Sequence, residues 1–129
     1  MSLARNLLGY REFWEPDAIR QIIENAPEFN PSSESVDEAR TLLIFETSKQ
    51  RTWLVATAIR LYCVLDDVRK DKPRLQWSVL KGEAAHIETR SKTDQTGLVD
   101  IGTRHRWWLY SKRLFDRKSI EQQISELIV

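Results

Sequence analysis

Three cationic residues occur where a loop could present them to an anion: Lys49, Arg51 and Arg60. Lys49 and Arg51 fall in a polar stretch between two apolar segments, and Arg60 opens the next apolar segment. Such side chains donate charge-assisted hydrogen bonds to phosphate or carboxylate oxygens. We therefore predict that these three residues bind a ligand, with a solvated hairpin tip as the alternative.

A second group of residues combines positive charge with aromatic rings, as do surfaces on which nucleic-acid bases stack. Its members are Arg104, His105, Arg106, Trp107 and Trp108. Neighbouring residues of a strand face opposite sides, so we expect one tryptophan in the core and the other outside it or under the N-terminal helix. The formal net charge of +1 is far from the strongly basic character of nucleic-acid-binding proteins. We expect no nucleic-acid partner.

No set of residues has the spacing of a known catalytic or zinc centre. His86 and Glu88 match the first half of a zinc deaminase motif, but no Pro-Cys-x-x-Cys follows them. Two histidines and one cysteine do not supply a four-ligand zinc site. Cys63 lies between Leu61 and Leu65 in an apolar segment, which predicts a buried and inert thiol. We expect a non-enzymatic protein with no cofactor and no metal.

Three acidic residues that lie close together could bind a hard cation. They are Asp66, Asp67 and Asp71. Lysine and arginine residues alternate with them within residues 66–74 and would neutralise them locally. The sequence therefore predicts a salt-bridged loop in this stretch.

Charge is distributed unevenly along the chain. Residues 1–48 contain 4 Lys or Arg against 9 Asp or Glu, residues 49–118 contain 16 against 8, and residues 119–129 contain 0 against 2. The three parts carry −5, +8 and −2, which sum to +1. The basic middle could be a surface for anionic partners, or the acidic ends could fold back onto it.

Two helices are predicted near the ends of the chain. Isoleucines at 19, 22 and 23 recur at helical spacing between Pro16 and Pro27, which predicts a helix with one apolar face within residues 14–27. A short helical turn is expected at residues 36–40, with plain loop as the alternative. An amphipathic helix over residues 119–129 closes the chain, and either Asp116 or Ser119 could cap it.

Between these helices, β-branched and aromatic residues separated by turn residues predict seven short strands. The strands cover residues 41–47, 52–57, 60–65, 75–80, 85–90, 97–101 and 106–110. A single buried helix over residues 53–65 is the alternative to the second and third strands.

The length and composition of the chain set its class. With 129 residues, 41% of them hydrophobic, it is long enough for one core and too short for two ordinary domains. Its longest apolar stretch, residues 53–65, is shorter than the roughly 18 residues of a membrane-spanning helix. No basic stretch followed by a long apolar core opens the sequence, so we expect no secretory signal. A single cysteine is typical of a reducing compartment, so we expect a cytoplasmic location.

Seven antiparallel strands followed by one amphipathic helix resemble the pleckstrin-homology-like (PH-like) superfold. The stretch from Thr57 to Tyr62, which reads TAIRLY, is similar to the T-x-x-R-L-Y hairpin of bacterial PH-like and GRAM-type domains. The resemblance covers residues 41–129. It implies a mainly β fold, a split barrel of about seven antiparallel strands capped by a C-terminal helix. Residues 1–40 lie outside it and are expected to form a helical extension packed on the domain.

The resemblance implies a domain that carries lipid headgroups, peptides or partner domains, and the fold alone does not choose among them. Phosphoinositide-binding members carry a basic pair at the end of the second strand, where this chain has only Arg60. We therefore predict contact with a protein partner or a second copy, through the basic hairpin tip or a sheet edge. One alternative is peripheral binding of anionic lipid through Lys49, Arg51 and Arg60. Another is a small-ligand carrier or enzyme with an interior cavity.

Overall fold

The computed structural model of the protein describes residues 13–129, which form seven strands and five helical segments. The helical segments are α2 (Pro16–Glu24), the 3-10 turn η1 (Val36–Glu38), α3 (Lys81–Ala84), the 3-10 turn η2 (Lys112–Phe115) and α4 (Ile120–Leu127). The strands are β1 (Arg40–Glu46), β2 (Gln50–Ala56), β3 (Arg60–Asp67), β4 (Arg74–Leu80), β5 (Ile87–Ser91), β6 (Thr96–Ile101) and β7 (Trp108–Ser111).

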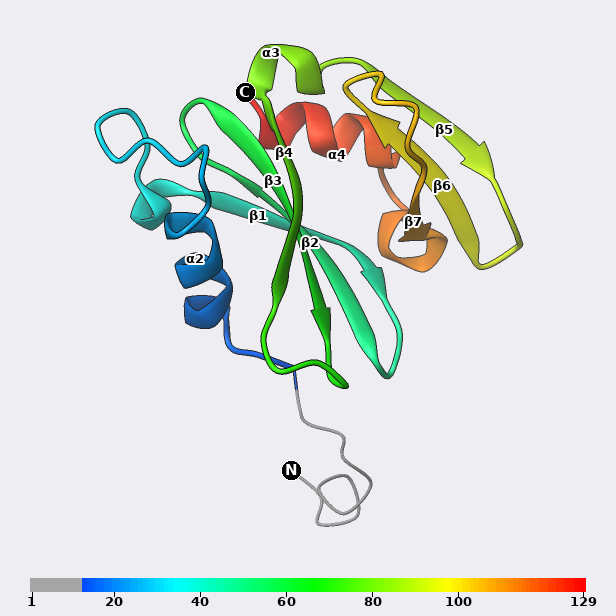
Figure 1. Cartoon of the computed structure of the whole chain (residues 1–129). Helices are drawn as coiled ribbons and strands as arrows, with labels where there is room; N and C mark the ends of the chain where they lie inside the picture. Colours follow the sequence, from blue (N-terminus) through cyan, green and yellow to red (C-terminus); the bar gives the residue numbers. More distant parts are fainter. Residues whose placement is uncertain (1–12) are drawn as a thin grey trace.

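The strands form two antiparallel sheets, one of four strands in the order β1-β2-β3-β4 and one of three in the order β5-β6-β7 (Figure 1). Each strand pairs with its neighbour in the sequence, as short turns require of antiparallel strands. The predicted strands and the C-terminal helix are confirmed. The alternative helix over residues 53–65 is wrong, because the chain turns after Ala56 and brings Leu54 opposite Cys63.

The expected split barrel is not supported, because the two sheets are not closed into one. The short helix α3 turns the chain between β4 and β5, and no strand ladder joins the two sheets within residues 13–129. At the other junction, β1 and β7 meet through a side chain. The backbone N–H of Glu46 donates a hydrogen bond to Ser111 Oγ at 3.0 Å.

The main core lies between the two sheets and α4. Three residues of the apolar stripe expected in this helix, Ile120, Ile124 and Leu127, are buried. The fourth, Ile128, follows the end of α4 and is only partly buried. The backbone N–H of Gln122 donates to the Ser119 side chain, which caps the helix as expected. From the sheets, Trp77 and Trp108 pack together with ring centroids 6.2 Å apart.

A second core covers the outer face of the four-stranded sheet. Ile19 and Ile23 of α2 pack there against Val55, Tyr62 and Val64. Figure 1 shows α2 lying alongside this sheet, on the side away from α4. Since both faces of β3 are thus covered, six of its eight residues are buried.

The N-terminal helix predicted within residues 14–27 is observed as α2, and the predicted short turn is observed as η1. The part of the predicted extension before Phe13 lies outside the described residues. Among residues 13–129, no helix is long and apolar enough to cross a membrane.

Candidate functional site

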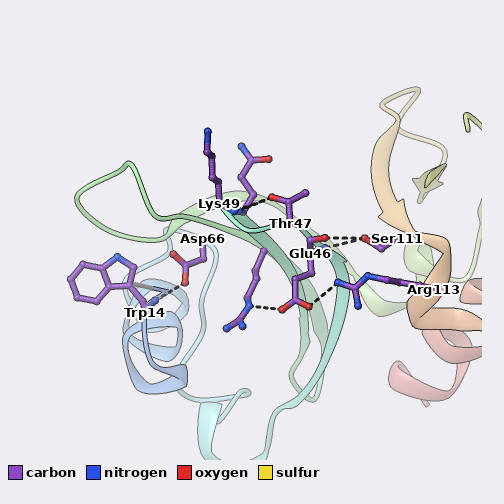
Figure 2. Close-up of polar contacts among 9 residues, drawn as sticks. Trp14, Glu46, Thr47, Lys49, Asp66, Ser111 and Arg113 are labelled. Carbon is purple, nitrogen blue, oxygen red and sulfur yellow. Dashed lines mark hydrogen bonds and ion pairs between the residues drawn. The ribbon is translucent and has the colours of Figure 1, made fainter. Parts of the chain in front are cut away.

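The turn between β1 and β2 is organised by one threonine. Thr47 Oγ1 accepts hydrogen bonds from the backbone N–H groups of Lys49 at 3.2 Å and Gln50 at 3.0 Å, and the Thr47 N–H donates to the Gln50 carbonyl at 2.8 Å. The Lys49 carbonyl accepts from the N–H of Val68, which fixes the turn to the end of β3. These bonds anchor the turn, and the Lys49 side chain is exposed on it (Figure 2).

Arg51 is half-buried and bonded within the protein. Its Nε donates to Glu46 Oε2 at 2.8 Å, and its guanidinium lies 4.2 Å from the centroid of the Phe13 ring. Glu46 Oε1 also accepts a hydrogen bond from Arg113 at 2.9 Å (Figure 2). The hydrogen bond from Arg113, together with that from Arg51, lowers the pKa of Glu46 although burial opposes it. The Arg51 charge is thus balanced by a carboxylate of the same chain.

Two neighbouring carboxylates at the end of β3 have opposite surroundings. Asp67 accepts hydrogen bonds from Arg69 Nη2 at 2.7 Å and from the Gln50 amide at 3.1 Å, and the Arg69 bond is the main reason that its pKa is lowered. Asp66 is fully buried and accepts one hydrogen bond, from the backbone N–H of Trp14 at 2.8 Å (Figure 2). Burial raises the pKa of Asp66. The predicted salt bridging in this stretch is confirmed for Asp67 and not for Asp66.

The three predicted anion contacts do not form one cluster. Because β2 and β3 are antiparallel, Arg51 lies opposite Asp66, whereas Arg60 lies beyond the pair formed by Ala56 and Leu61 at the other end of the sheet. The five-residue step from Arg51 to Ala56 alone spans about 17 Å of strand. Only Lys49 and Arg51 share an end of the sheet. A ligand-binding role stays a prediction for all three residues.

Two side chains of the TAIRLY stretch bind the carboxylate of Glu34, a residue that the sequence alone does not indicate as important. Glu34 is buried, and its Oε1 accepts hydrogen bonds from Thr57 Oγ1 at 2.5 Å and from the Tyr62 hydroxyl at 2.8 Å. Its Oε2 accepts from the N–H of Asn30 at 2.8 Å. Burial, and then the neighbouring Glu34, raise the pKa of Tyr62. This stretch therefore ties the loop before η1 to the β2–β3 hairpin.

Strand β5 directs some of its backbone N–H and C=O groups to the sheet edge that faces away from β6. Residues of an antiparallel strand alternate between bonding to the partner strand and pointing away from it. Just before β5, the His86 carbonyl accepts from the Gly102 N–H at 2.7 Å, and just after it the Lys92 N–H donates to the Thr96 carbonyl at 3.1 Å. The even-numbered residues of β5 therefore bond to β6.

The odd-numbered residues of β5 consequently direct their N–H and C=O groups to the outer edge. They are Ile87, Thr89 and Ser91. No further strand pairs with β5 on that side within the described chain. The side chain of Thr89 donates to Glu121 Oε1 of α4 at 2.9 Å, so α4 runs close to this edge.

The basic and aromatic segment predicted near β7 divides as expected. Trp108 packs against the main core. Trp107 lies outside it, and the guanidinium carbon of Arg90 lies 4.1 Å from the centroid of its ring. The preceding loop is held by buried Asp100, which accepts hydrogen bonds from the backbone N–H groups of Arg104 and His105.

The residues weighed as catalytic or metal-binding candidates are not brought together. Within residues 13–129, no group of three or more His, Cys, Asp or Glu side chains is arranged to hold a metal ion. Cys63 is fully buried as predicted, and burial raises the pKa of its thiol, which keeps it protonated and unreactive.

Comparison with known proteins found no matching family model, no matching curated protein and no matching solved structure.

Proposed function

We propose that this chain is a non-enzymatic PH-like binding module that contacts a protein partner, or a second copy of itself, through the outer edge of β5. The order of four strands, three strands and a C-terminal helix supports the PH-like relationship. The observation that carries the binding proposal is the outward-facing backbone of Ile87, Thr89 and Ser91. Such an edge is a template on which an extended segment can add a further strand.

At the other sheet edges, a side chain bonds to an outward backbone group. The edges of β1 and β7 are joined by the hydrogen bond between Glu46 and Ser111. On β4, the Ser78 carbonyl accepts a hydrogen bond from Arg104 at 3.5 Å. Edge strands without such protection are the ones that pair with another chain.

A protein partner is favoured over a lipid headgroup because the predicted cations are separated. Lipid binding would depend on Lys49 and Arg51 at the β1–β2 turn, and Arg51 is already bonded to Glu46. An interior ligand cavity has less support still. One pocket, between α2, η1 and β2, lies on the outer face of the four-stranded sheet, and its lining includes one tryptophan, Trp53.

The test uses two substitutions at one position of β5. Thr89→Pro removes an outward N–H and leaves the ladder to β6 in place, a position where edge strands tolerate proline. Thr89→Val keeps that N–H and loses only the hydroxyl bonded to Glu121. Light scattering measures self-association, and affinity capture followed by mass spectrometry identifies a protein partner whose affinity is then measured by calorimetry. We expect Thr89→Pro to weaken association by about tenfold or more and Thr89→Val to change it little.

A strict monomer that captures no protein would overturn the proposal, as would a Thr89→Pro variant that associates like the unaltered chain. Sedimentation with phosphatidylserine vesicles is a parallel experiment that tests the lipid alternative. Vesicle binding that weakens with salt and is lost in Arg51→Glu would support the lipid alternative instead.

A further inference from the structure

A pocket of about 170 Å³ lies between the N-terminal segment and the outer face of the four-stranded sheet. Ile19 of α2, Val36 of η1 and Val55 of β2 form apolar walls, and Trp53 provides an aromatic one. Trp53 is half-buried, so part of its ring is open to solvent. The pocket is thus bounded by α2, η1 and the sheet, and Figure 1 shows α2 beside that sheet.

The size of the pocket limits what it can hold. Apolar cavities of about 150 Å³ accommodate a benzene molecule. A volume of about 170 Å³ therefore fits one branched or aromatic side chain and is too small for a folded element or a lipid headgroup with its chains. Six of the nine lining residues are apolar, and the two charged ones, Arg20 and Asp37, pair with each other, so an apolar group is the favoured inserted part.

The surroundings of the pocket are acidic. At its rim, Arg20 contacts Asp37 directly and lies 3.6 Å from Asp17. The Asp37 side chain is 88% exposed. Six of the lining residues come from residues 13–39, a segment that has seven acidic residues against one basic residue, Arg20. A ligand that reaches the pocket therefore meets a net negative surface.

We propose that this pocket binds a basic peptide segment, with one leucine- or phenylalanine-sized side chain inserted between Ile19, Val55 and Trp53. The lysine or arginine residues that flank the inserted side chain lie against Asp17 and Asp37. The site is on the four-stranded sheet, whereas the β5 edge belongs to the other sheet. Evidence against the β5-edge interface would therefore not count against the peptide pocket, and the reverse also holds.

Three amidated heptapeptides are the probes. The first has a central phenylalanine flanked by lysines, the second has glycine in the centre of the same lysines, and the third has the phenylalanine flanked by glutamates. NMR titration of the full chain follows the methyl signals of Ile19, Val36 and Val55 and the indole N–H signal of Trp53. We expect the first peptide to shift these signals and to bind about tenfold or more tightly than the second, because only the first buries an aromatic ring. The third should bind least, and salt should weaken the first.

Two variants locate the binding. Thr41 is an exposed residue of β1 that lines the pocket, so Thr41→Phe fills the space without entering the core. Asp37→Lys reverses a rim charge, and Asp94→Lys makes the same change in the exposed turn between β5 and β6. Thermal unfolding verifies that each variant is folded. We expect Thr41→Phe and Asp37→Lys to lose binding of the first peptide by about tenfold, and Asp94→Lys to retain it.

Equal binding of the phenylalanine and glycine peptides would overturn the proposal. Binding that survives in Thr41→Phe, or signal shifts confined to residues outside the pocket, would do the same. Equal binding of the lysine- and glutamate-flanked peptides would instead assign the pocket to a small apolar group without charge selection, and would also refute the basic-peptide ligand.

Discussion

Asp66 and Asp67 are neighbours in the sequence, yet their surroundings shift their pKa values in opposite directions. Asp67 receives hydrogen bonds from Arg69 and Gln50, which favour its charged form. Burial favours the neutral form of Asp66 and raises its pKa, although the backbone N–H of Trp14 opposes this shift. Burial and partners, rather than the type of residue, therefore decide the charge state of each carboxyl group.

The pH dependence of stability should separate these two residues. A lowered pKa in the folded state means that Asp67 stabilises the fold above its unfolded pKa, near 3.8, and that this contribution is lost as the pH falls below it. We expect Asp67→Asn to lower the free energy of unfolding by about 1–2 kcal/mol at pH 7, a value reduced by the exposure of Arg69 to solvent. Urea denaturation should find this deficit shrinking between pH 4 and pH 2.

Asp66→Asn is the matched control, because the raised pKa of Asp66 gives the opposite sign. Ionised Asp66 costs stability as the pH rises through its folded pKa, and asparagine removes that cost. The difference between this variant and the unaltered chain should therefore shift in favour of the variant between pH 4 and pH 7. Parallel pH profiles for the two substitutions would contradict the assignment.

At the scale of elements, the β2–β3 hairpin joins parts of the chain that are distant in the sequence. Tyr62 of β3 bonds to Glu34, which lies 28 positions earlier, and Thr57 in the hairpin turn bonds to the same carboxylate. This buried network fixes the loop that leads into η1. The stretch that suggested a family resemblance thus has a clear structural role in this molecule.

Tyr62→Phe tests how much this network contributes. The substitution leaves the ring in place and deprives the buried Glu34 carboxylate of one donor. Because hydrogen bonds to charged groups are among the stronger ones, we expect a loss of about 1–3 kcal/mol in the free energy of unfolding. Hydrogen exchange should also become faster in residues 28–36, which the network anchors.

Tyr110→Phe serves as the control for Tyr62→Phe. Tyr110 is half-buried and packs edge-on against Phe115 at 5.8 Å, and its hydroxyl makes no hydrogen bond among the described residues. The free energy of unfolding of the Tyr110→Phe variant should differ from that of the unaltered chain by less than about 0.5 kcal/mol. Equal losses for both tyrosines would show that the Glu34 bond is not the source of the effect.

The whole molecule is a four-stranded sheet covered on both faces, joined to a three-stranded sheet that shares its main core. Among residues 13–129, only some of the acidic residues from the two ends of the sequence pair with the basic middle part. Glu46, from the acidic first part of the sequence, pairs with Arg51 and Arg113 of the basic middle, and Glu126 pairs with Lys118. Asp37 of η1 lines the pocket and remains exposed although it pairs with Arg20.

Removal of the N-terminal segment tests whether residues 40–129 are stable without it. The fragment would expose Val55, Tyr62 and Val64, which are buried against α2 in the full chain. Since each buried side chain of this size contributes about 1.5–3 kcal/mol, we expect a loss of several kcal/mol. Circular dichroism should detect a much lower melting temperature, and a dye that binds apolar surface should fluoresce. A fragment as stable as the full chain would contradict the shared second core.

The sequence by itself determined the elements, because their patterns depend on residues a few positions apart. Alternating apolar residues and turn residues predicted the strands, and the spacing of Ile120, Ile124 and Leu127 predicted the buried face of α4. The four-residue helix α3 was not foreseen, since it is too short to display a period. The sequence also indicated that Cys63 would be buried and that one of two adjacent tryptophans would enter the core.

Only the tertiary structure decided which of these elements share a surface. It separated Arg60 from Lys49 and Arg51, left the sheets unclosed, and placed α2 on the outer face of the four-stranded sheet. The contacts responsible join residues far apart in the chain, such as Trp14 and Asp66, which are 52 positions apart. Local propensity contains no information about such pairs, because their formation depends on how whole faces of sheets and helices bury one another.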